Sequence, residues 1–441
     1  MLQLSPDTRP DQGGTEGPRP PRHRKWLPGK GRRLAAFLAL MLTAGLVGAG
    51  LTSVGLLSIG RGQSGVTGAI AMLPEAVASR LQAGGLDGEA SALPMPAGPA
   101  VRAVMPTAAA HKHKPTPAAG RSGVNGGTIT TGDSKAHCIT MDFSGGVLDQ
   151  SAINAVSNLT GVTYNCLGTF ANPMATWDEW ETPWMFSTAS DGWDAWLAAS
   201  PAHQVVMSMD LIPQEVSNND DPLAWEQPCA AGSYNQYATT LAQNLVSYGA
   251  GNIVIRLGTE ANGTWEADYV GSTSDEMSGW AKCFANEVSS MRAVPGAHFL
   301  FIWNPNSCTA NLPIADWYPG NSYVDIIGVD AYDTDCETLQ TVGQEGWAAY
   351  STDSASSAAS DPNFPSLANM EAFARANGKP LSFPEWGLGA GDDPAYMTGM
   401  AQMFNSNDFS FESYFDNNDD GIAPLGSAIP SATTAYAQAF G

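Results

Sequence analysis

The stretch NIVIRLGTEANGTW, residues Asn252–Trp265, decides the fold. It opens on a β-branched apolar run, Ile253–Ile255, which is typical of a parallel strand buried on both faces. The run leads to Glu260 and breaks at Asn262–Gly263. A β/α barrel carries its chemistry on side chains at the carboxyl ends of such strands. Taken alone, Glu260 has an alternative interpretation, in which it caps a helix or pairs with Arg256.

A second stretch favours a chemical role. Residues 380–387 read PLSFPEWG, an apolar strand with Glu385 near its end. The barrel fold brings strand ends to one face, so Glu385 and Glu260 are expected to lie together. A retaining glycosidase needs two such carboxyl groups, one to attack the sugar and one to donate and then remove a proton. The sequence therefore predicts Glu260 and Glu385 as catalytic residues.

The region from residue 136 to residue 441 alternates strand and helix patterns, which favours βα units and a parallel sheet. Further strands are expected at residues 138–143, 162–170, 204–212, 298–306, 324–333 and 409–415. Helices are expected at residues 149–159, 192–199, 234–248, 279–292, 367–377, 396–404 and 433–440. The alternation fits a (β/α)₈ TIM barrel, with the two glutamates on strands four and seven.

Charge is distributed unevenly along the chain. The formal net charge is -23, yet residues 1–33 are basic and residues 136–441 hold most of the acids. An acidic surface disfavours nucleic acid and anionic membranes as partners. We expect a monomeric domain that acts on a neutral polysaccharide.

The chain before residue 136 divides into three parts. Residues 1–33 form a basic tail, predicted to be cytoplasmic, and residues 34–60 carry no charge and are long enough to span a bilayer of ~30 Å. This segment is either a signal anchor or a long signal peptide, with Ala69–Ala71 as a distant cleavage site. Residues 61–135 are predicted to be a disordered linker, including the His111–Lys114 run. Either alternative predicts an extracellular or cell-surface domain, with the membrane contacted only through the N-terminal segment.

All the cysteines follow the linker, and their even number in an exported domain predicts disulfides. Sequence does not fix the pairing. Pairing of neighbours is the prediction, which gives Cys138–Cys166, Cys229–Cys283 and Cys308–Cys336. The sequence has no CxxC or Cys/His cluster that would indicate a zinc site, so we predict no metal and no cofactor.

Four blocks resemble glycoside hydrolase family 26, the β-mannanase family. They are RLGTEANGTW at 256–265, WNPN at 303–306, WYPGNSYVDIIGVDAYD at 317–333 and PEWG at 384–387. The resemblance implies a retaining endo-acting barrel enzyme, with Glu260 as the acid/base and Glu385 as the nucleophile. It implies further that Trp265 lines the sugar site, that Tyr332 contacts the nucleophile and that Asp330 contacts substrate. Arg256 matches the family arginine four positions before the acid/base.

One position departs from the family pattern. Thr259 stands where the family usually has a histidine that helps to hold substrate and nucleophile. Because of this departure, a mixed-linkage β-glucanase or a β-xylanase remains an alternative to the predicted β-mannanase. A surface-tethered carbohydrate-binding pseudoenzyme and a structural envelope protein are alternatives of other classes, and the two glutamates argue against both.

Aromatic and polar side chains near the strand ends are candidates for sugar binding. Sugar rings stack on flat indole faces, which favours Trp265, Trp303 and Trp386, although ordinary core packing explains a tryptophan equally well. Asp210 and Asn262 are further candidates for hydrogen bonds to sugar hydroxyls, with loop or capping roles as the alternative. Trp177, Trp180 and Trp184 follow strand two and are placed to extend a cleft.

Overall fold

The computed structural model describes most of the chain from residue 128 onward. The described part is residues 128–441 without 144–145, 172–173, 188–190, 308–311, 335–342, 344–346, 349, 352–360, 362, 407 and 419–420. The predicted tail, the uncharged segment 34–60 and nearly all of the predicted linker lie outside it. Within it, no helix is both long and apolar enough to cross a membrane.

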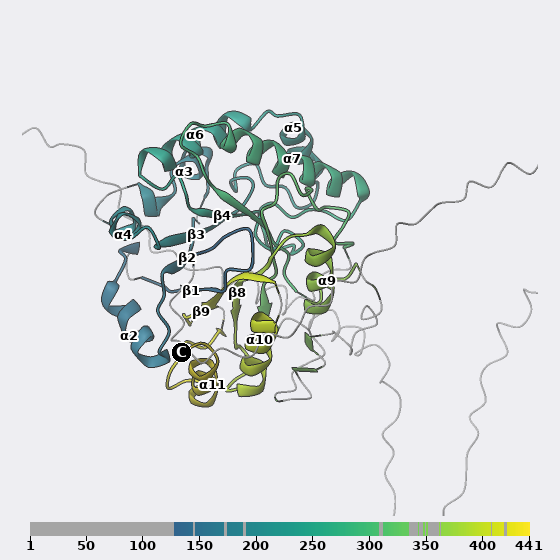
Figure 1. Ribbon diagram of the computed structural model, residues 1–441. Coiled ribbons are helices and arrows are strands. Elements are labelled where there is room, and N and C mark those ends of the chain that lie inside the picture. The colour runs from purple at the N-terminus through teal and green to yellow at the C-terminus, as the bar shows by residue number, and fades with distance from the viewer. Residues whose placement is uncertain are drawn as a thin grey trace, which may run out of the picture. The chain divides into compact units, whose positions relative to one another are not determined.

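A single parallel sheet closes on itself to form the centre of the molecule (Figure 1). Its order is β6-β5-β4-β3-β2-β1-β9-β8, and β6 pairs with β8 to close the ring, while the short β7 extends the sixth position beside β8. The predicted eight-stranded barrel is confirmed. The strands are β1 (Ala136–Thr140), β2 (Cys166–Phe170), β3 (Gln204–Met209), β4 (Val254–Leu257), β5 (Leu300–Trp303), β6 (Ile326–Gly328), β7 (Ala331–Tyr332), β8 (Leu381–Gly387) and β9 (Phe409–Phe415).

Helices surround the barrel, as Figure 1 shows. Most of them connect one strand to the next, which is the crossover that parallel pairing demands. The α-helices are α2 (Gln150–Thr160), α3 (Trp177–Glu181), α4 (Trp193–Ala199), α5 (Leu223–Ala230), α6 (Asn235–Ser247), α7 (Ser274–Arg292), α9 (Leu367–Asn377), α10 (Pro394–Ser406) and α11 (Pro430–Phe440), and η2 (Trp184–Phe186) is a 3₁₀ turn.

Capping residues explain where several helices begin and end. The Asp149 side chain accepts from the first turn of α2, and Gly378 ends α9 in the left-handed region at φ 63°. The start of α7 was predicted too late in the chain. Thr273 and Glu276 form a capping box there, so the helix begins at Ser274, ahead of its first long apolar face. The helix α5 was not predicted, since Pro228 near its end obscures the pattern.

Two apolar layers lie on opposite sides of the strands. The inner cluster is built almost entirely from strand residues, among them Val206, Val254, Ile302 and Phe411. The outer cluster combines the alternate strand residues with the buried faces of the helices. This division follows from the two-residue period of a strand, and it decides which strand-end side chains reach the barrel mouth.

The two predicted disulfides within the described residues are present. Cys138–Cys166 joins neighbouring positions of β1 and β2, and Cys229–Cys283 ties α5 to α7. Cys308 and Cys336 lie outside the described residues.

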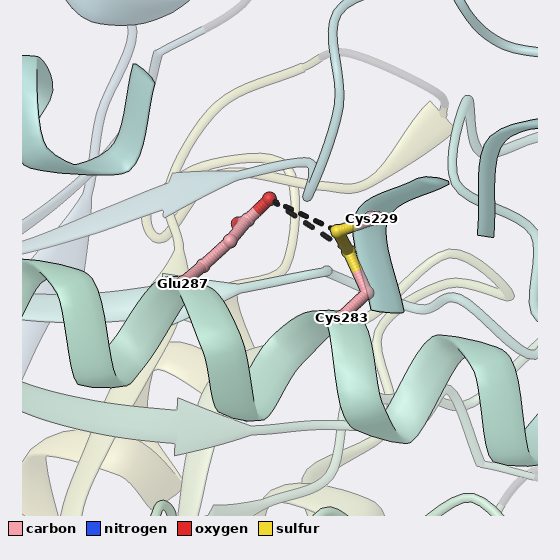
Figure 2. Close-up of side chains that lie close together, drawn as sticks. All are labelled: Cys229, Cys283 and Glu287. Carbon is pink, nitrogen blue, oxygen red and sulfur yellow. Dashed lines mark hydrogen bonds between the residues drawn. A yellow bond between two sulfur atoms is a disulfide. The ribbon is translucent and has the colours of Figure 1, made fainter. Parts of the chain in front are cut away.

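Figure 2 shows Glu287 of α7 pointing at the second bridge, with its Oε1 3.7 Å from each sulfur. Sulfurs bonded to each other carry no proton. Burial is the main cause that raises the pKa of Glu287 well above its ordinary value, and the charge of Asp268 adds to it. Any hydrogen bond between Glu287 and the disulfide therefore uses the proton of the Glu287 carboxyl group.

Candidate active site

The two predicted catalytic glutamates lie at the same end of the barrel. Glu260 follows the end of β4, and Glu385 lies in β8, the seventh position of the ring. Glu260 is 2% exposed and Glu385 is 6% exposed. Arg256 interacts with both glutamates: its guanidinium donates a hydrogen bond to Glu385, and its positive charge interacts with Glu260.

A local irregularity in β8 aims Glu385 inward. The register of β8 against β9 shifts between Phe383 and Trp386, so two residues lie between these outward-facing side chains. Such a bulge redirects the side chains within it. Glu385 therefore points into the barrel while Trp386 points toward the helices.

Two donors hold the Glu385 carboxylate. Arg256 Nη1 donates to Oε2 at 2.7 Å, and the Tyr332 hydroxyl donates to Oε1 at 2.5 Å. Burial, and then the charge of Glu385, raises the pKa of Tyr332 well above its ordinary value. Tyr332 therefore keeps its proton and remains a donor at every physiological pH.

Arg256 is the centre of a buried polar network. Besides Glu385 it bonds the Asp330 carboxylate, the Asn304 side-chain oxygen and the Ser208 hydroxyl. Burial opposes its charge, but Asp330, Glu385 and Glu260 together raise the pKa of Arg256, so it stays protonated. A buried charge is stable only with such partners.

Asp330 is fully buried beside this guanidinium. Burial raises the pKa of Asp330 well above its ordinary value, against the effect of Arg256, and the charges of Glu385 and Glu260 raise it further. Three carboxyl groups thus surround one cation. The raised pKa of Asp330 favours its protonated form beside these negative neighbours.

Glu260 has an unusual backbone conformation. Its φ of 47° lies in the left-handed region, which costs a residue other than glycine about 1–2 kcal/mol. Its N–H donates to the Asn304 carbonyl at 3.1 Å, and its own carbonyl accepts from Gly263 N–H at 2.7 Å. These bonds hold the strained turn in place, and backbone strain of this kind is concentrated at functional sites.

The Glu260 carboxyl accepts a hydrogen bond on each oxygen. Trp265 Nε1 donates to Oε2 at 2.9 Å, and Asn306 Nδ2 donates to Oε1 at 2.8 Å. The indole of Trp265 lies so close to Gly263 that a Cβ there would be 2.3 Å from the ring, which explains the glycine. Trp265 is partly exposed. Its predicted contact with sugar stays a prediction.

An apolar cluster surrounds Tyr332, at the ends of three strands. Tyr332, Phe415 and Ile422 are buried together, with the partly exposed Phe170 against them. The Phe415 ring centroid lies 6.0 Å from that of Tyr332 and 6.1 Å from that of Phe170, both edge to face.

The structure corrects the prediction that Trp303 and Trp386 bind sugar. Each is fully buried on the outer side of the barrel. Trp303 packs against Trp317, and Trp386 donates its Nε1 hydrogen to Glu412 at 2.8 Å. Trp303 follows the inward-facing Ile302, so strand alternation turns it toward the helices, and the bulge in β8 does the same to Trp386.

The structure shows the partners of four polar residues whose contact with substrate stays a prediction, Arg256, Asp330, Asn262 and Asp210. Arg256 and Asp330 pair with each other below the surface, and Arg256 also pairs with Glu385. The Asn262 amide pairs with the backbone of Asn306. Asp210 directly follows β3 as a buried carboxyl beside Asp268.

Sequence reasoning missed three members of the site. Ser208 and Asn304 bond Arg256, and Asn306 bonds Glu260. The two asparagines lie in the WNPN block that carries the family resemblance, so a signal for them existed. Ser208 had none, because a serine in a buried strand is common.

One group of potential metal ligands occurs among the described residues, Cys229, Cys283 and Glu287. Its two sulfurs form the disulfide that Figure 2 shows, so they are not available as thiolates. It lies between α5 and α7, in the helix layer.

The barrel and the site define a class of protein, and a comparison with protein families agrees with it. Residues 230–345 match the family described as Glycosyl hydrolase family 26. The matched segment contains Arg256, Glu260, Asp330 and Tyr332. The chain is a glycoside hydrolase, and its resemblance to family 26 is confirmed over this segment. None of the curated proteins compared with the chain matches it.

Solved structures with a similar fold include several mannanases. A Bacillus subtilis mannanase is 14% identical, with 69% of this chain and 85% of that chain covered and a TM-score of 0.46. A Bacteroides ovatus family 26 β-mannanase is 12% identical, with 71% and 87% covered and a TM-score of 0.47. A modular endo-β-1,4-mannanase of Cellulomonas fimi is 17% identical, with 71% and 70% covered and a TM-score of 0.47.

Proposed function

We propose that this chain is a retaining endo-β-glycosidase that hydrolyses β-1,4-mannan by double displacement. The observation that carries the proposal is the placement of Glu260 and Glu385, from two strand ends of one barrel face, around Arg256. Two carboxyl groups at one site are the requirement of this chemistry.

In the first step Glu385 attacks the anomeric carbon while Glu260 gives its proton to the departing glycosidic oxygen. A covalent glycosyl ester of Glu385 results, and the leaving chain departs as an alcohol. Arg256 and Tyr332 hold the nucleophile in place before the attack, since each donates a hydrogen bond to its carboxylate. They stay bound to Glu385 while its charge is lost to the new bond.

In the second step Glu260, now ionised, removes a proton from water. The water attacks the anomeric carbon, the ester bond to Glu385 breaks and the configuration is restored. The buried position of both carboxyl groups limits competing solvent. The proton that Glu260 takes from water restores its acid form for the next cycle.

Mannan is the proposed polymer because the four family 26 blocks surround the site. The alternative is a mixed-linkage β-glucan or a β-xylan, and one observation favours it. Thr259, which is 6% exposed, replaces the family's histidine directly before the acid/base. A shorter side chain without the imidazole donor changes the hydrogen bonds offered to the sugar next to Glu260. A carbohydrate-binding pseudoenzyme would not need both glutamates with their donors.

The proposed function is tested by reducing-sugar release from galactomannan, glucomannan, mixed-linkage glucan and xylan. Glu260→Gln and Glu385→Ala serve as controls, with the fold of each variant checked by circular dichroism. Release from the two mannans alone, absent from both variants, supports the proposal. Release from glucan or xylan instead moves the substrate and keeps the mechanism. Release that persists in Glu385→Ala contradicts the assigned nucleophile.

We propose further that the chain is exported, with residues 34–60 as signal anchor or signal peptide and residues 61–135 as linker. The disulfides support this proposal, because such bridges persist in oxidising compartments. Cell fractionation with an antibody to the barrel checks it. Recovery of the barrel in the cytoplasmic fraction would contradict it.

A further inference from the structure

The segment after β5 approaches the predicted acid/base from inside the barrel mouth. Asn306 lies three residues past the end of β5, and it is 2% exposed. Its Nδ2 donates to Glu260 Oε1 at 2.8 Å. A buried amide that donates to a carboxyl oxygen fixes the direction in which that carboxyl faces.

Asn262 locks Asn306 in place. The Asn306 N–H donates to Asn262 Oδ1 at 2.9 Å, and Asn262 Nδ2 donates to the Asn306 carbonyl at 3.0 Å. One side chain thus pairs with both backbone groups of Asn306, as a neighbouring strand would. Because backbone N–H and C=O have fixed roles, the pairing also fixes which way round the Asn262 amide lies.

The same segment holds the Glu260 backbone. The Asn304 carbonyl accepts from Glu260 N–H at 3.1 Å, and Asn262 follows Glu260 by two residues. The left-handed turn at Glu260 therefore places Asn262 where it reaches Asn306, and Asn306 reaches back to the Glu260 carboxyl. The three residues form a closed loop of contacts, which we name the asparagine lock.

We propose that Asn306, held by Asn262, is a positioning residue that fixes the Glu260 carboxyl through Oε1. The other oxygen, Oε2, lies beside the partly exposed Trp265 and exchanges the proton with the glycosidic oxygen and with water. This inference rests on the proposed function, since it assigns a residue to the acid/base of the same reaction.

The lock also influences the two protonation states of Glu260. An N–H donor stabilises a carboxylate more than a carboxylic acid. Loss of the Asn306 amide therefore favours the protonated state. Charged or titratable groups that interact with Glu260 include Arg256 on β4, Asp330 before β7 and Tyr332 on β7. None of them is removed by a change at Asn306.

The experiment compares Asn306→Ala and Asn262→Ala with the full-length protein. Asn286→Ala is the matched control, because this asparagine donates to the α5 backbone carbonyls of Cys229 and Ala230, away from the site. Two substrates are used for each protein, an oligosaccharide of the sugar that the wild type accepts and its dinitrophenyl β-glycoside. The dinitrophenolate leaves without a proton, so its kcat/KM does not need the acid.

We expect Asn306→Ala to lose at least about tenfold in kcat/KM on the oligosaccharide, part of the ~10²–10⁴ that a positioned acid/base contributes, and much less on the dinitrophenyl glycoside. The alkaline limb of its kcat/KM profile moves to higher pH. Asn262→Ala changes both in the same direction by a smaller amount, and Asn286→Ala changes neither. Equal losses on both substrates with an unmoved alkaline limb overturn the inference.

A second measurement needs no turnover. The carboxyl of Glu260 is followed by ¹³C NMR in labelled protein and assigned by its absence in Glu260→Gln. The titration midpoint of Glu260 is expected to rise in Asn306→Ala relative to the wild type, and an unchanged midpoint overturns the inference. If no glycan is hydrolysed by the wild type, the proposed function fails, and this titration still decides the inference.

Discussion

Glu226 gives the sharpest prediction on stability. It lies on α5 and is fully buried, and neither of its carboxyl oxygens has a hydrogen-bond partner among the described residues. The neighbouring helix α7 accommodates it at Gly279, where a Cβ would lie 2.8 Å from Oε2. Burial, followed by the charges of Glu276 and Asp268, raises the pKa of Glu226 from 4.5 to about 9.

The shift converts into a dependence of stability on pH. The unfolded chain releases this proton near pH 4.5, whereas the folded protein holds it to about pH 9. Between these values the folded state binds more protons, so the free energy of unfolding falls as pH rises, by about 1.4 kcal/mol per pH unit. The contribution of Glu226 is therefore a loss of about 5 kcal/mol between pH 4.5 and pH 8.

Glu226→Gln keeps the shape and removes the ionisation. We expect the variant to lie within about 1 kcal/mol of the wild type at pH 4 and to be about 4 kcal/mol more stable at pH 8, because an unpartnered amide offsets part of the gain. Urea unfolding followed by tryptophan fluorescence at pH 4, 6 and 8 measures it. Parallel pH curves for the two proteins would refute the reasoning.

Glu276→Gln is the control with the opposite sign. Its carboxylate accepts from the N–H groups of Ser272 and Thr273 at 2.7 Å each. Against the effect of burial, these bonds lower the pKa of Glu276, so its contribution is present above the unfolded pKa and is lost in acid. Replacement by glutamine is expected to cost stability at pH 7 and to cost less at pH 3.

Three further predictions concern the site and the barrel. Tyr332→Phe removes the donor at 2.5 Å from Glu385 and should lower kcat about 10- to 100-fold with the fold unchanged by circular dichroism. Arg256→Met leaves buried carboxylates without their cation and should cost about 3–5 kcal/mol in urea unfolding, with retained stability as the contradicting result. Cys138→Ser with Cys166→Ser opens a bridge of sequence separation 28 and should cost about 3–4 kcal/mol, whereas an unchanged melting temperature would contradict it.

The barrel was predictable because its strands are apolar runs that alternate with helices. The predicted strand at residues 409–415 and the predicted helix at residues 367–377 have the bounds of β9 and α9. The start of α7 was missed, since its first turn is polar and depends on the capping box of Thr273 and Glu276. A capping box can be recognised from the local sequence, but here it places the helix start earlier than the periodic apolar residues do.

The positions of Glu260 and Glu385 followed from the ends of their strands. The sequence did not show which neighbouring side chains reach the site, because strand alternation and bulges decide where each one points. The bulge in β8 sends Trp386 outward, and the alternation in β5 does the same to Trp303. A tryptophan beside a catalytic strand end is therefore weak evidence of sugar binding until its face of the strand is known.

The polar network was predictable only in part. The contact of Tyr332 with Glu385 is implied by the family resemblance, but the bonds of Arg256 to Ser208, Asn304 and Glu385 join strands that are distant in sequence. The role of Asn306 depends on the left-handed turn at Glu260, which no local pattern announces. Closure of the barrel brings these strands together, so the pairs of side chains become known only from the folded structure.

The central claim is that Glu385 forms a glycosyl ester which Glu260 then helps water to open. The most direct test is the anomeric configuration of the first product, followed by ¹H NMR within the first turnovers on a mannan oligosaccharide. Double displacement predicts that the β-anomer appears first and that the α-anomer grows later by mutarotation. A product that appears first as the α-anomer would contradict the account, because it would mean that water, and not Glu385, attacks the sugar.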